Sequence, residues 1–78
     1  SSGQKVYQMQ EQLNRIARNF PAIPRINDDG IYGPATAEAV RTFQSVFDLP
    51  ATGDVDYPTW NSISDIYVGV TRIAEPGT

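Results

Sequence analysis

With 78 residues and no cysteine or histidine, the chain can form one domain with a small core, but no disulfide framework, thiol nucleophile, imidazole base or ordinary zinc site. Its net charge of −3 and its 6 scattered basic residues argue against nucleic acid, whose phosphates are usually met by clustered Lys and Arg. No run of about 20 apolar residues could insert into a membrane, and neither a metal nor a cofactor is indicated.

Both ends of the chain are expected to lie outside the domain. Residues 1–3 read as a cloning remnant or a linker, and residues 71–78 as a tail or linker, which leaves residues 4–70 as the domain. No signal peptide is visible. The chain is therefore predicted to be one module of a longer protein, linked to catalytic or other domains.

The stretch from Gln4 to Phe20 predicts a first helix. Apolar residues at spacings of three and four lie on one face: Val6, Met9, Leu13, Ile16, Ala17 and Phe20. Pro21 closes the helix, because the residue before a proline is steered away from helical angles. The loop that follows is predicted to be irregular, with Ile23 and Ile26 holding it to the core.

The segment 29–36 is predicted to be a tight loop that enters a second helix, which runs from Pro34 to about Phe47. Gly30 and Gly33 supply backbone angles that a Cβ makes costly, and Pro34 suits the first helical position. Gly33 is then the N-cap, and Thr36 is placed to bond back as in a capping box. The inner stripe is Thr36, Ala39, Val40, Phe43 and Phe47.

This loop–helix unit occurs twice. The alignment places Gly53 on Gly30, Val55 on Tyr32, Asp56 on Gly33 and Thr59 on Thr36. Asp56 is a good N-cap for a third helix, expected from Tyr57 to Tyr67 or Gly69, with Trp60, Ile63 and Tyr67 on one face. The predicted fold is an all-α, compact three-helix bundle with two ordered loops, and short β-like pairing within the loops stays open.

Several of these residues form motifs in a fixed order: Asp29–Thr36 (DGIYGPAT), Ala39-Val40, Phe43-Gln44, Leu49-Pro50, Thr52-Gly53, Val55-Asp56 and Thr59-Trp60. Over about residues 6–63 the chain resembles the peptidoglycan-binding domain family, whose pattern reads roughly DG-x-FG-x-x-T, AV-x-x-FQ, GL-x-x-TG-x-VD and TW. Tyr32 replaces the usual Phe, and the loop at 21–28 is longer than in many members.

The resemblance implies a non-catalytic module that binds peptidoglycan and targets an attached protein or hydrolase to a bacterial wall or spore cortex. Its location would be extracytoplasmic, in a bacterial or phage-derived protein. The partner would be the glycan or the stem peptide, and the module would act as a monomer. The alternative is a protein-interaction or pro-segment module, because a similar fold serves in some metalloprotease zymogens. Those pro-segments use a cysteine, which this chain lacks.

Enzymatic activity in the chain itself is not expected. Its loop aspartates could offer a carboxylate pair of the glycosidase type, but each has a simpler use as a turn former or helix cap. The serines have no histidine to activate them. We therefore expect no catalytic residue.

The binding site is predicted on the first repeat loop and the near flank of the second helix, as a shallow groove made by Asn27, Asp28, Asp29, Ile31, Arg41 and Gln44. Ordinary solvated surface is the alternative, and the outer face of the first helix around Tyr7 and Asn14 is the second choice. Gln10 and Gln44 are also read as partly buried amides that hold loop backbone groups. For Trp60, helical register favours the core over stacking on a sugar ring.

Overall fold

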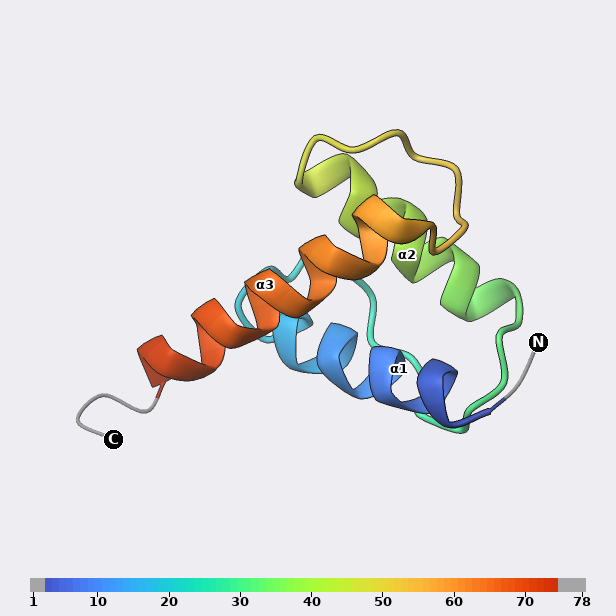
Figure 1. The fold of residues 1–78 in the computed structure, drawn as a ribbon, viewed down its shortest axis with the longest axis horizontal. Coiled ribbons are helices and arrows are strands. Elements are labelled where there is room, and N and C mark those ends of the chain that lie inside the picture. Colours follow the sequence, from blue (N-terminus) through green and yellow to red (C-terminus); the bar gives the residue numbers. More distant parts are fainter. Residues whose placement is uncertain (1–2, 75–78) are drawn as a thin grey trace.

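In a computed structural model, which describes residues 3–74, three helices are joined by two long loops (Figure 1). They are α1 (Gln4–Ala17), α2 (Pro34–Val46) and α3 (Tyr57–Ala74), and this range contains no β-strand. The predicted all-α, three-helix fold is confirmed. Residues 1–2 and 75–78, parts of the expected linker and tail, lie outside the described residues. None of the three helices is both long and apolar enough to cross a membrane.

Helix α1 forms because its apolar residues share one face, and Met9, Leu13, Ile16 and Ala17 are buried there. It ends at Ala17, before the predicted Phe20. The N–H groups of Arg18 and Asn19 turn back to the carbonyls of Arg15 and Ile16, at 3.2 and 2.9 Å, which tightens the last turn into 3₁₀ geometry. Phe20 then leaves the helix axis and packs edge-on against Phe47, with ring centroids 4.9 Å apart.

Helix α2 begins at Pro34 with Gly33 as its N-cap, as predicted, and ends one residue before the predicted Phe47. A Schellman motif stops it. Asp48 adopts φ 64°, and the Leu49 N–H reaches the Gln44 carbonyl at 2.7 Å. The chain is thereby turned into the second repeat loop.

Helix α3 continues to Ala74, beyond the predicted end at Tyr67 or Gly69. A glycine inside a helix costs about 1 kcal/mol, but the next residue, Val70, is buried as α3 packs along α1. This tertiary contact overrides the weak local signal at Gly69. The helix also crosses residue 71, where the tail was expected to begin, while the domain boundaries themselves stay a prediction.

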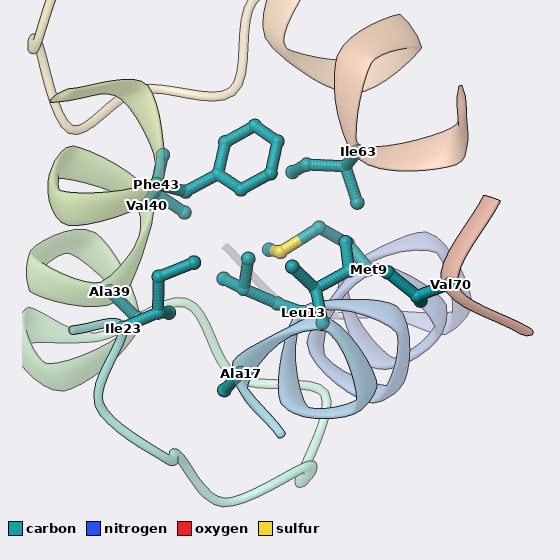
Figure 2. Packing of buried hydrophobic residues seen from close by; sticks show 10 residues of the cluster. Met9, Leu13, Ala17, Ile23, Ala39, Val40, Phe43, Ile63 and Val70 are labelled. Atoms are coloured by element: carbon teal, nitrogen blue, oxygen red, sulfur yellow. The ribbon is translucent and has the colours of Figure 1, made fainter. Parts of the chain in front are cut away.

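The core lies where the three helices and the loop after α1 meet (Figure 2). It consists of Met9, Leu13, Ile16, Ala17, Ile23, Ala39, Val40, Phe43, Ile63 and Val70. Ile23 is buried, and Ile26 packs against the core from its edge. Trp60 also packs against the core, as predicted, but remains only partly buried. Part of the Trp60 side chain is therefore exposed to solvent.

Candidate functional site

The first repeat loop is held from inside by the amide of Gln10 on α1, which is 0% exposed. Its Oε1 accepts the Gly30 N–H at 2.8 Å, and its Nε2 donates to the Ile31 carbonyl and to Thr36 Oγ1, both at 3.0 Å. Gly30 has φ 77°, a conformation that favours glycine. One buried amide thus fixes the bend of the loop and the start of α2.

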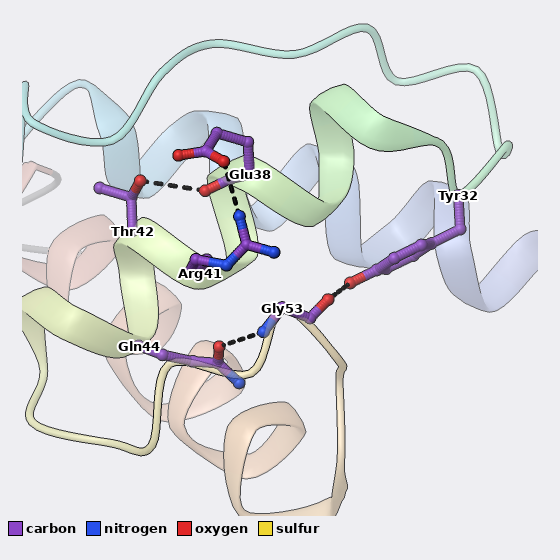
Figure 3. A network of polar contacts seen from close by, with 6 residues as sticks. All are labelled: Tyr32, Glu38, Arg41, Thr42, Gln44 and Gly53. Atoms are coloured by element: carbon purple, nitrogen blue, oxygen red, sulfur yellow. Dashed lines mark hydrogen bonds and ion pairs between the residues drawn. The ribbon is translucent and has the colours of Figure 1, made fainter.

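Gln44 on α2 holds the second loop in the same way (Figure 3). Its Oε1 accepts the Gly53 N–H at 2.9 Å, and its Nε2 donates to the Asp54 carbonyl at 2.9 Å and to Thr59 Oγ1 at 3.0 Å. Gly53 has φ 81°. The repeat recognised in the sequence is therefore also a repeat of hydrogen bonds. Both glutamines hold loop backbone groups, as predicted. They are fully buried, whereas partial burial was expected.

The two repeat threonines lie in the first turns of α2 and α3, as predicted. The expected capping box at Thr36 is wrong, because its hydroxyl accepts a bond from Gln10 instead. Gly33 has no side chain to complete a reciprocal cap. In the second copy the predicted N-cap of α3 forms, because Asp56 Oδ1 accepts the Thr59 N–H at 3.1 Å.

Four of the predicted site residues lie together on the exposed first loop: Asn27, Asp28, Asp29 and Ile31. The Ile31 side chain is 58% exposed. Asp29 Oδ1 accepts the Ile31 N–H at 3.0 Å and a longer bond from Gln10 at 3.3 Å, so this carboxylate also shapes the turn. A shallow hollow of about 140 Å³ lies between Asn27, Asp29, Ile31 and the start of α2.

The other two predicted site residues, Arg41 and Gln44, lie on α2 and contact the second loop rather than the first. The Arg41 guanidinium pairs with Glu38 at 2.7 Å and lies against Gly53, where an added Cβ would be 3.1 Å from Arg41 Nη2 (Figure 3). Gln44 is 0% exposed. Of the second-choice residues, Asn14 is occupied by two bonds to the backbone of Ile26.

A second surface, which the sequence reasoning missed, lies between the two loops. The Tyr32 hydroxyl donates to the Gly53 carbonyl and so joins them (Figure 3). Tyr32, Val55 and Trp60 line a hollow of about 380 Å³, whose remaining lining is Lys5, Val6, Met9 and Asp54. The signal was present in the alignment of Tyr32 with Val55, since equivalent positions of the two loops face a shared space.

A larger hollow, about 680 Å³, runs along the other side of α1 beside the second half of α3. It is lined by Gln8, Glu11, Gln12, Arg15, Arg18, Tyr67 and Thr71. Arg15 is oriented there by Asn19 Oδ1 at 2.8 Å and by the Val70 carbonyl at 3.4 Å. The extension of α3 past its predicted end supplies Thr71 to one wall of this hollow.

The shifted pKa values near the loops have structural causes. Hydrogen bonds from the Thr59 hydroxyl and N–H hold the pKa of the Asp56 carboxyl below its ordinary value. Burial raises the pKa of the Tyr32 hydroxyl, the Asp54 charge adds to this, and Arg41 opposes it. Within residues 3–74 no three acidic side chains gather as they would around a metal ion. The Asp56 carboxylate serves as a helix cap, and the Tyr32 hydroxyl makes a contact between the two loops.

The fold and the two clamped loops define a small helical module that presents polar and aromatic groups on its surface. The chain belongs to the peptidoglycan-binding domain family, a family of non-catalytic modules, because the family model "Putative peptidoglycan binding domain" matches residues 2–63. This confirms the family resemblance seen in the motifs.

The chain is also similar to the human (Homo sapiens) collagen alpha-6(VI) chain, with 26% identity over an alignment of 84 residues. That alignment covers 96% of this chain but only 4% of the collagen chain. No solved structure matches the chain at a significant level.

Proposed function

We propose that this domain binds peptidoglycan without cutting it and thereby holds an attached protein at a bacterial wall or spore cortex. The observation that carries the proposal is the repeated glutamine clamp. Gln10 and Gln44 satisfy the inner backbone groups of both loops, so the outer groups are presented in a fixed arrangement. A preorganised surface loses less entropy on binding.

The contact surface in this proposal is the exposed first loop. Asn27 and Asp28 offer amide and carboxylate groups to sugar hydroxyls, N-acetyl groups and peptide amides, and Ile31 offers an apolar patch beside them. Asp29 orients the turn as well as facing solvent. Arg41 and Gln44 act through the second loop, which they contact and hold.

Weak binding is sufficient for such a module. Even a modest affinity raises the effective concentration of a covalently linked enzyme near an insoluble polymer. In this proposal the domain acts as an extracytoplasmic monomer within a longer chain, and any wall hydrolysis belongs to a linked domain. Asp29 serves a turn and Asp56 a helix cap, which supports a binding role for the domain itself.

A sedimentation assay with purified insoluble peptidoglycan tests this function. We expect the parent domain to sediment with the wall and the double variant Asn27→Ala/Ile31→Ser to be retained less at equal helical content. Val68→Ala is the matched control, because Val68 is 46% exposed and lies on α3 far along the chain from both loops. A separate Arg41→Ala variant measures what the second loop adds.

Each outcome has a defined consequence. A parent domain that does not sediment with peptidoglycan contradicts the function itself. A double variant that is retained as well as the parent contradicts the first loop as the contact surface and leaves the function standing.

A further inference from the structure

Two neighbouring hollows at the start of α3 form one continuous surface, because both are lined by Lys5, Val55 and Trp60. The first, of about 380 Å³, also includes Tyr32 and Asp54, and the second, of about 370 Å³, adds Asp56 and Tyr57. We call this surface the aromatic groove; its main lining is Lys5, Tyr32, Asp54, Val55, Tyr57 and Trp60. Volumes of this size are within the range of small-ligand sites.

The walls of the groove are fixed, and one aromatic ring stands open at its rim. Tyr32 is anchored through its hydroxyl to the Gly53 carbonyl, and Trp60 packs against the core. Tyr57, the first residue of α3, is 77% exposed. Large aromatic rings at the surface bring much apolar area with a polar tip and suit ligands that have both characters.

The rim carries one ammonium and two carboxylates, and so has no net positive charge. Lys5 contributes an ammonium group and Asp54 a carboxylate, whereas the Asp56 carboxylate accepts hydrogen bonds from Thr59. A groove of this kind matches an uncharged ligand that carries hydroxyl and amide groups and has an apolar ring face. A stem peptide with several carboxylates would find no net positive charge here.

We propose that the aromatic groove binds the sugar backbone of the wall polymer, with an N-acetylated hexosamine ring lying against Tyr57 and Trp60. Lys5 donates to hydroxyl or acetamido oxygens, and Asp54 accepts from hydroxyl groups. This inference rests on the proposed function, and it assigns glycan rather than stem peptide as the ligand of this surface.

The chain itself contains a reporter for this site. Trp60 is the single tryptophan of the chain and lines both hollows, so the tryptophan emission comes from a residue of the groove. The probes are soluble glycan strands from which an amidase has removed the peptides and, separately, the released stem peptides. We expect a saturable change in Trp60 emission with the strands and none with the peptides.

The variant Tyr57→Ala tests the contact without disturbing the core, because this side chain is almost entirely outside it. We expect it to weaken binding of the strands by about three- to tenfold, the range that one aromatic contact contributes, with unchanged thermal unfolding. Val68→Ala, an exposed residue on the same helix, should leave the affinity unchanged.

The outcomes separate this inference from the proposed function. Sedimentation with insoluble peptidoglycan together with an unresponsive Trp60 overturns the groove and leaves wall binding intact. A response to the stem peptides alone, or a Tyr57→Ala variant with parental affinity, also overturns it. Loss of both sedimentation and fluorescence response overturns the groove and the proposed function together.

Discussion

The Tyr32 hydroxyl donates a hydrogen bond to the Gly53 carbonyl oxygen and so joins the two repeat loops. Each loop is also held by its own glutamine, Gln10 in the first and Gln44 in the second. The glutamine hydrogen bonds fix the conformation of each loop. The Tyr32 hydrogen bond fixes the position of one loop relative to the other. This arrangement gives the aromatic groove its walls.

Tyr32→Phe is expected to lower the free energy of unfolding by about 1 kcal/mol, because it removes one partly buried hydrogen bond. The folded-state pKa of Tyr32 is raised above the ordinary 10.0. The stabilisation from this hydroxyl is therefore fully present below pH 10.0 and is lost as the pH rises through the folded-state pKa. Urea unfolding of parent and variant should differ at pH 7 and converge at high pH. A difference that stays constant across this range would contradict the assignment.

Gln44→Ala should cost about 2–4 kcal/mol, because it leaves the Gly53 N–H and the Asp54 carbonyl without their partner and opens a cavity. Gln10→Ala should cost a similar amount, since its bonds are equivalent. Both values can be measured by urea unfolding. The exposed variant Gln8→Ala is a matched control on α1 and should stay close to the parent. Parental stability in Gln44→Ala would contradict the clamp.

The Asp56 cap predicts an acid-dependent loss of stability. Its folded-state pKa is lowered below the ordinary 3.8 by hydrogen bonds from Thr59. The stabilisation is therefore present above pH 3.8 and is lost as the pH falls through the folded-state pKa. Carboxyl chemical shifts followed by NMR should place the Asp56 midpoint below 3.8. Asp56→Asn keeps a cap but should lose this part of the pH dependence. A midpoint at or above 3.8 would contradict the bond.

Trp60→Ala is expected to cost about 2–4 kcal/mol, less than truncation of a fully buried aromatic residue such as Phe43, because Trp60 is only partly buried. This is a large fraction of the stability of a small domain. Far-ultraviolet circular dichroism during urea unfolding measures it without the tryptophan. A variant with parental stability that no longer binds the wall would show that Trp60 serves the ligand alone.

Local chemistry in the sequence was enough to predict where the helices begin and how the repeat is arranged. Pro34 after Gly33, and Asp56 before Tyr57, mark helix starts through caps and fixed backbone angles that act within a few residues. Apolar spacing likewise predicted most of the core and the structural use of Gln10 and Gln44. The first-loop residues of the predicted site, such as Asn27 and Ile31, are exposed as expected, and their contact with the wall remains a proposal.

Contacts between segments distant in the sequence decided where α3 ends, what Arg41 contacts and where the aromatic groove forms. Helix α3 passes Gly69 because Val70 is buried as the helix packs along α1. The Arg41 guanidinium of α2 lies against the second loop because Gly53 leaves room for it. The aromatic groove exists only where Tyr32, Val55 and Trp60 are brought together from two loops and a helix. Helical periodicity shows which face of a helix is apolar, but how much of a large side chain that face covers depends on what packs against it.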